Sequence, residues 1–354
     1  MASKNVYLII IAAVAVVVVA GVAFLAFKPA TPVQPSVAKV TLPTGEQIEI
    51  PPGLKGHVML YTSIPQEITS GWQNDWNQFF SNYTQLEIYR AGTGTVVSKI
   101  LAEEQAGGTK ADVIYLAGIF DYLQLVDKGV IGNIPDVPEL KSIPSQYIDP
   151  KGKYVIGRLL VMVIVYNPDL VKDPPKSWQD LLKPEWNGKI AIANPLVSGS
   201  MQYATLALVS QYGWDYFRKL KQNNPLLLQD VPDVARSVAQ GERPVGVTLT
   251  MYLKTYTNLK YVIPQEGAIV IPSPLGIAKR SENSTDAVLL FRYLLTKQAA
   301  THLANAYTYG TRTDAPTPPG LPAISEIKSF PASIDSLKPY VPGLRGNWTS
   351  IFGG

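Results

Sequence analysis

The feature that most constrains the fold is a regular alternation of short apolar stretches and amphipathic stretches after residue 56. The stretches HVMLYTS, QLEIYRA and ADVIYLA each precede a segment whose apolar residues recur at helical spacing. A second block, from GKIAIAN to LTMYL, repeats this order. Strand–helix–strand alternation is typical of a parallel sheet covered by helices. We therefore predict an α/β protein.

A long apolar run, YVIGRLLVMVIVY, separates the two blocks. It is longer than an ordinary strand, so we expect it to cross from one lobe of the protein to another. The chain after Gly310 is rich in proline, and we expect it to be loose.

Composition excludes several classes of function. The 354 residues carry a net charge of only +4 without a basic run, so a nucleic-acid partner is not expected. The absence of cysteine excludes disulfides, thiolate metal sites and a lipid-modified cysteine. The two histidines, His57 and His302, lie in no catalytic motif, and no P-loop or HExxH motif occurs. We therefore do not expect an enzyme.

The N-terminal region has the composition of a membrane segment. Residues 6–27 carry no charge, and a helix of this length rises about 33 Å, enough to cross a hydrocarbon core of about 30 Å. We predict that residues 1–28 are a membrane anchor, with a cleaved signal as the alternative, and that residues 29–55 are a proline-rich spacer. The glycosylation triplets that begin at Asn82, Asn283 and Asn347 fit an outer face. The rest of the chain is thus expected outside the cell.

Three junctions between a predicted strand and a predicted helix carry small polar residues. They are Ser63, the turn Thr93-Gly94-Thr95, and the turn Ser198-Gly199-Ser200. Free N–H groups and the positive end of a helix bind anions, and hydroxyls add donors. The same residue types also serve simply as helix caps. Because ligands of open α/β sheets bind beyond the carboxyl ends of the strands, three such junctions favour an anion site.

These blocks, in this order, resemble a known family. The motifs LYTSIPQE, RAGTGTVVSKILAE, VYNPDLVKDPPKSWQDLLKPEWNGKIAIANPLVSGSMQYATLAL and PSPLGIAKRSENSTDAVLLFRYLL are similar to those of extracellular solute-binding proteins of ABC importers. The resemblance covers nearly all of residues 57–323 and is strongest to the branch that binds ferric ion, thiamine and phosphorylated compounds.

The resemblance implies a two-lobed, type II periplasmic-binding-protein-like fold that closes on its ligand. Lobe one would comprise residues 56–158 and 268–354, and lobe two residues 159–267. The protein would act as a monomer, without a resident cofactor, and would deliver its ligand to an ABC-transporter permease from the outer face of the membrane.

The ligand class is less constrained. Ferric members bind iron through adjacent tyrosines, but the matching position here reads Met251-Tyr252, and only Tyr252, Tyr256 and Glu67 are left as candidate ligands for Fe3+. Members that bind organic phosphates use Ser/Thr-Gly turns. We therefore expect a small anionic ligand, with ferric iron as the first alternative and a secreted enzyme on the same scaffold as the second; a surface adhesion protein is a weaker reading. The expected ligand-binding residues are Ser63, Thr93, Gly94, Thr95, Ser198, Gly199, Ser200, Thr248 and Tyr252.

Overall fold

A computed structural model describes residues 38–282 and 284–353, and residues 39–354 form one compact unit. The predicted membrane anchor and the glycosylation site at Asn283 lie outside the described residues. Within the described ranges, no helix is long and apolar enough to cross a membrane.

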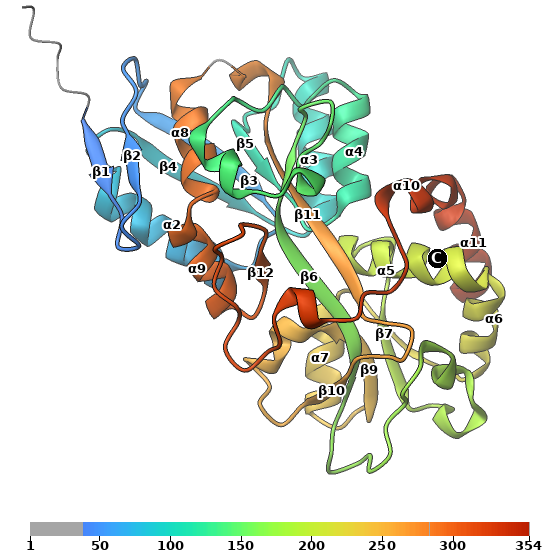
Figure 1. The fold of residues 1–354 in the computed structure, drawn as a ribbon. Coiled ribbons are helices and arrows are strands. Elements are labelled where there is room, and N and C mark those ends of the chain that lie inside the picture. The colour runs from blue at the N-terminus through green and yellow to red at the C-terminus, as the bar shows by residue number, and fades with distance from the viewer. Residues whose placement is uncertain (1–37, 283, 354) are drawn as a thin grey trace, which may run out of the picture. The chain divides into compact units, whose positions relative to one another are not determined.

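A mixed ten-stranded sheet forms the centre of this unit (Figure 1). The strand order is β4-β3-β5-β11-β6-β9-β7-β8, with β10 and β12 also paired to β6. The first three strands are parallel to one another, as are β7, β8 and β9. The strands are β3 (His57–Thr62), β4 (Gln85–Arg90), β5 (Val113–Tyr115), β6 (Val155–Tyr166), β7 (Ile190–Ala193), β8 (Leu226–Leu228), β9 (Val245–Leu249), β10 (Lys260–Val262), β11 (Ile269–Ile277) and β12 (Tyr309–Gly310).

Two long antiparallel strands join the two parallel groups. The apolar run folds as the single strand β6, whose first half pairs with β11 and whose second half pairs with β9. The far end of β11 pairs with β5. Figure 1 shows β6 and β11 running together from one group of strands to the other. The run is long because β6 extends from one group of parallel strands to the other.

Helices follow the strands as the alternation predicts. The α-helices are α2 (Gln66–Phe79), α3 (Thr93–Gln105), α4 (Ile119–Asp127), α5 (Gly199–Tyr212), α6 (Asp215–Gln222), α7 (Val231–Ala239), α8 (Thr285–Leu294), α9 (Lys297–Asn305), α10 (Ile334–Leu337) and α11 (Leu344–Phe352). The 3-10 turns are Pro138–Ser142, Ser145–Tyr147, Trp178–Leu182, Pro184–Trp186, Thr250–Leu253, Lys279–Ser281, Ile324–Glu326 and Lys338–Gly343.

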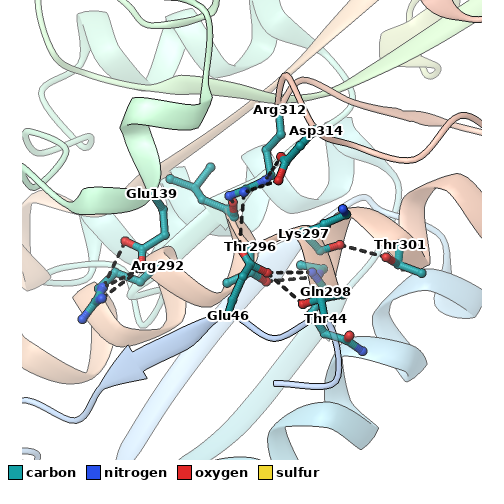
Figure 2. A network of polar contacts seen from close by, with 12 residues as sticks. Thr44, Glu46, Glu139, Arg292, Thr296, Lys297, Gln298, Thr301, Arg312 and Asp314 are labelled. Atoms are coloured by element: carbon teal, nitrogen blue, oxygen red, sulfur yellow. Dashed lines mark hydrogen bonds and ion pairs between the residues drawn. The ribbon is translucent and has the colours of Figure 1, made fainter. Parts of the chain in front are cut away.

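A separate hairpin, β1 (Lys39–Thr41) and β2 (Gln47–Glu49), precedes the sheet. Its apolar side chains join a buried cluster with β3, α2, α8 and α9. Figure 2 shows the polar contacts that hold it: Glu46 accepts from the Gln298 backbone N–H and pairs with Arg312, while Arg292 binds the carboxylate of Glu139 through two nitrogens. Arg292 also donates to the carbonyl of Glu49. The hairpin is therefore fixed to the end of the unit that holds α8 and α9.

The C-terminal segment differs from the expected loose tail. It forms α10 and α11, which contact α5 and α6 (Figure 1). Trp348 is fully buried, and its ring lies 5.4 Å from that of Phe217 on α6. Proline content misled the prediction because most prolines after Gly310 precede α10, and the two later ones, Pro339 and Pro342, lie in the 3-10 turn between α10 and α11. The sequence assigned this segment to lobe one, but its contacts are with helices assigned to lobe two.

Candidate functional site

A cavity of about 70 Å³ lies where the ends of both groups of strands meet. It is bordered by the chain that follows β3, β4, β5, β7 and β9, by the starts of three helices, and by β6. The lining residues are Ser63, Pro65, Arg90, Gly92, Thr93, Ala117, Arg158, Leu160, Val197, Ser198, Gly199, Ser200, Asp230, Val231, Pro232, Leu249, Met251 and Tyr252. Its position agrees with the general rule for ligand sites in α/β sheets.

On the first side, Ser63 and Thr93 form one hydrogen-bonded unit. The Thr93 hydroxyl donates to Ser63 Oγ over 3.0 Å, and the Ala117 N–H donates to the same oxygen over 2.8 Å. Since Ser63 Oγ already accepts two hydrogen bonds, its own proton is left to donate elsewhere. The start of α3 follows Gly92, which provides no side-chain cap, and its first turn has no acidic residue. This side therefore offers donors to an anion.

On the second side, α5 begins with the Ser198-Gly199-Ser200 turn. Ser198 Oγ accepts from the Met201 N–H over 3.4 Å and lies 3.3 Å from Ser200 Oγ, so Ser198 also caps the helix. The two sides touch through glycine: a Cβ added to Gly199 would lie 2.9 Å from Gly118 Cα and 3.1 Å from Thr93 Oγ1. A side chain there would hold the two sides apart.

Three of the expected binding residues do not line the cavity. Thr95 is exposed, and Gly94 lies one residue from the lining without joining it. Thr248 is fully buried, and its hydroxyl donates over 2.7 Å to the carbonyl of Val231. On strand β9 successive side chains face opposite sides, so Leu249 reaches the cavity and Thr248 contacts the start of α7. Its contacts are those of a supporting residue.

Two arginines that we did not predict line the cavity. Arg158 lies on β6 and is 1% exposed; its Nε donates to Ser273 Oγ over 3.3 Å, but its Nη1 has no hydrogen-bond partner within the described residues. Burial lowers the pKa of Arg158 to about 10. Arg90 ends β4 and donates from Nε to the Ile64 carbonyl over 3.3 Å. Arg158 could have been noticed as the one charge inside a long apolar run.

Tyr252 lines the second side of the cavity, in the 3-10 turn after β9. Burial raises the pKa of its hydroxyl well above the ordinary value, and the Asp230 carboxylate raises it further, while Arg158 and Arg90 act in the opposite direction. The phenol is therefore protonated at neutral pH and can donate a hydrogen bond. A protonated phenol suits an oxyanion, to which it can donate a hydrogen bond.

The residues expected for iron are not assembled in the cavity. Tyr252 lines it, but Tyr256 and Glu67 do not. Glu67, in the first turn of α2, instead forms an ion pair with Lys254, which follows the 3-10 turn. Over the ranges that the structure describes, no group of three or more His, Cys, Asp or Glu residues is placed to hold a metal ion.

Comparison with known proteins gives consistent results. Residues 109–328, more than half of the chain, match the family described as bacterial extracellular solute-binding protein. A putative 2-aminoethylphosphonate-binding periplasmic protein of Salmonella typhimurium is 24% identical over 78% of this chain and 84% of its own. An Fe(3+)-binding periplasmic protein of Serratia marcescens is 26% identical over 76% and 83%.

Solved structures show the same fold. The periplasmic binding protein AfuA from Actinobacillus pleuropneumoniae, with fructose-6-phosphate bound, superposes with a TM-score of 0.74 at 23% identity. The match covers 84% of this chain and 98% of that protein. The two-lobed periplasmic-binding-protein fold expected from the sequence is thereby confirmed.

Proposed function

Since the chain belongs to the bacterial extracellular solute-binding proteins, we propose that it captures a small oxyanion, a phosphate, phosphonate or carboxylate, in the cavity around Arg158. It performs no catalysis and passes the ligand to an ABC-transporter permease. The relatives named above are binding proteins, which supports this role.

The Arg158 guanidinium carries the proposal, because its Nη1 has no hydrogen-bond partner and it forms no ion pair within the part of the chain that the structure describes. A buried cation without a counter-charge is strongly unfavourable unless a ligand pairs with it. Arg158 is almost fully buried, borders the cavity, and is joined there by Arg90, by the Ser63–Thr93 pair and by the uncapped start of α3. Guanidinium is the side chain best suited to bind carboxylate or phosphate with two hydrogen bonds. A bound oxyanion therefore supplies the counter-charge for the Arg158 guanidinium.

Binding is coupled to lobe closure. We propose that one lobe contains β3–β5 with α2–α4, α8 and α9, and that the other contains β7–β9 with α5–α7, α10 and α11. Strands β6 and β11 join them. A ligand that touches Thr93 on one side and Ser200 on the other binds the closed state more tightly, and this differential affinity shifts the equilibrium toward closure. The contacts between Gly118 and Gly199 and between Glu67 and Lys254 belong to that closed state.

Attachment to the membrane is a further part of the proposal. We infer that residues 6–27 hold the protein at the outer face of the membrane, because the segment is uncharged and long enough to span the bilayer. The protein acts as a monomer on this tether. Glycosylation at Asn82, which is exposed, is compatible with this location.

Ferric iron fits the cavity less well. Only Tyr252 of the three residues expected for iron borders the cavity. Two cationic side chains beside it disfavour a trivalent metal ion.

The test is calorimetric titration of the full-length protein with inorganic phosphate, alkylphosphonates and short carboxylates. We expect Arg158→Met to weaken binding of the tightest of these at least about 30-fold, since a charge-assisted bidentate contact is lost. The control is Arg218→Met, which removes an exposed arginine on α6 and leaves affinity unchanged. Equal affinities of Arg158→Met and wild type would refute the proposal, and so would a protein that binds iron but none of these anions.

A further inference from the structure

One carboxylate, that of Asp230, borders the same cavity as Arg90 and Arg158. Asp230 is the N-cap of α7, and its Oδ1 accepts from the Val231 N–H over 2.8 Å. Within the described residues it forms no ion pair, whereas Asp233 on the same helix pairs with Arg236. A carboxylate placed in an anion site repels a simple anion and weakens its binding. The presence of Asp230 there is accounted for if the ligand also carries a group that a carboxylate can bind.

The three helix starts at the cavity are not electrostatically alike. The first turns of α3 and α5 contain no acidic residue, and their N–H groups face a site lined by hydroxyls. The start of α7 carries Asp230 and Asp233 in a reciprocal capping box, so its positive end is already neutralised. The cavity therefore has a cationic side, toward α3 and Arg158, and an anionic end at α7.

The pKa of the Tyr252 hydroxyl is influenced by the charges on both sides of the cavity. The Asp230 carboxylate raises the pKa of the Tyr252 hydroxyl, and the guanidinium groups of Arg158 and Arg90 lower it, although burial is the largest influence. These three charged groups, and with the smallest influence Asp233, are thus within electrostatic reach of one phenol that itself borders the cavity.

We infer that the ligand is a small zwitterion, whose oxyanion binds on the arginine side and whose ammonium group binds Asp230. This inference rests on the proposed function, because it needs the oxyanion to be held by Arg158. A cavity of about 70 Å³ limits the ligand to a short chain between the two groups. Asp230 is then the residue that distinguishes amino-substituted oxyanions from simple ones.

The experiment compares ligand pairs that differ only by an ammonium group in place of a methyl group. Calorimetry on the full-length protein uses 2-aminoethylphosphonate against propylphosphonate, and 3-aminopropanoate against butanoate. We expect the wild type to bind the amino member of at least one pair about 10-fold or more tightly than its methyl partner. In Asp230→Asn this preference should fall below about 3-fold, and affinity for the methyl partner should rise, since a repulsive charge is removed.

Asparagine is as good a helix cap as aspartate, so Asp230→Asn is expected to fold. The matched control is Asp233→Asn, which removes a charge from the same first turn that does not line the cavity and has the smaller influence on Tyr252; this variant should keep most of the preference of the wild type. Equal or tighter binding of the methyl partners by the wild type would overturn the inference and leave the proposed function standing. Binding of neither member of either pair would overturn the inference, and it would overturn the proposed function as well only if inorganic phosphate also failed to bind. Binding of iron alone would overturn both.

Discussion

At the residue scale, the site depends on a side chain that is unfavourable for the empty protein. Arg158 lies on a strand whose other residues are almost all apolar and buried, and the only hydrogen bond of its side chain within the described residues is the one to Ser273. Such placement lowers its pKa because burial disfavours the charged form. Function and stability are therefore opposed at this position.

This opposition can be measured with Arg158→Met in the absence of ligand. Methionine fills a similar volume without a buried charge, so we expect the free energy of unfolding to increase by roughly 1–4 kcal/mol. Urea unfolding of ligand-free wild type and variant gives the difference. A variant that is less stable than the wild type would show that Arg158 is already paired within the protein and would remove the argument for a bound anion.

Some residues of the site could be predicted from the sequence, and others could not. Ser63, Thr93 and Ser200 were placed together because each follows the carboxyl end of a strand, and chain order alone locates such positions. Thr95 was misplaced because two steps along α3 turn a side chain by about 200° from Thr93. Arg158 was missed because its burial depends on pairing of β6 with β11, which lies more than a hundred residues away.

At the scale of elements, α4 and α5 pack against each other. The rings of Phe120 and Tyr203 stack across this contact at 5.8 Å. Beside them, burial raises the pKa of Asp121 to about 6, and a hydrogen bond from Gln202 only partly offsets this. The contact between α4 and α5 therefore makes ionisation of this carboxyl group less favourable than it is in water.

The pH dependence of stability follows with a definite sign. The folded pKa of Asp121 is about 6 and the ordinary value is 3.8, so between these values the folded state binds the proton more tightly. This group's contribution to the free energy of unfolding is thus greatest below pH 4 and falls as pH rises to 6. We expect Asp121→Asn to raise the melting temperature by about 2–6 °C at pH 8, and by less at pH 4.5.

Thermal unfolding at the two pH values measures this difference. Asp127→Asn, an exposed change at the end of the same helix, is the control and should shift the melting temperature by similar amounts at both. If Asp121→Asn gave the same shift at pH 4.5 and pH 8, Asp121 would not be buried against α5 in solution.

Element prediction succeeded where a local pattern decided the structure. Helix α5 begins at Gly199, in the Ser198-Gly199-Ser200 turn that the sequence places at a strand–helix junction, because Ser198 is a cap that sequence identifies. The C-terminal helices were missed because α11 is stabilised by the burial of Trp348 against Phe217, a contact that the local sequence does not reveal.

At the scale of the whole molecule, two groups of parallel strands share one pair of long strands, and the candidate site lies between the ends of the two groups and β6. This arrangement was predictable because the alternation of strands and helices occurs twice, with one long apolar run between the blocks. The charge pattern of the cavity was not, since Arg158 and Asp230 come from β6 and the start of α7 and meet only in the folded protein.

The central claim is that the cavity around Arg158 is completed by a bound oxyanion. It is tested most directly by a crystal structure of the protein grown with the anion that calorimetry shows to bind most tightly. The account predicts oxyanion oxygens about 2.7–3.0 Å from the Arg158 guanidinium, with Thr93 and Ser200 on opposite sides of the ligand. A ligand bound elsewhere, or a metal ion coordinated by Tyr252 with Arg158 turned away, would contradict it.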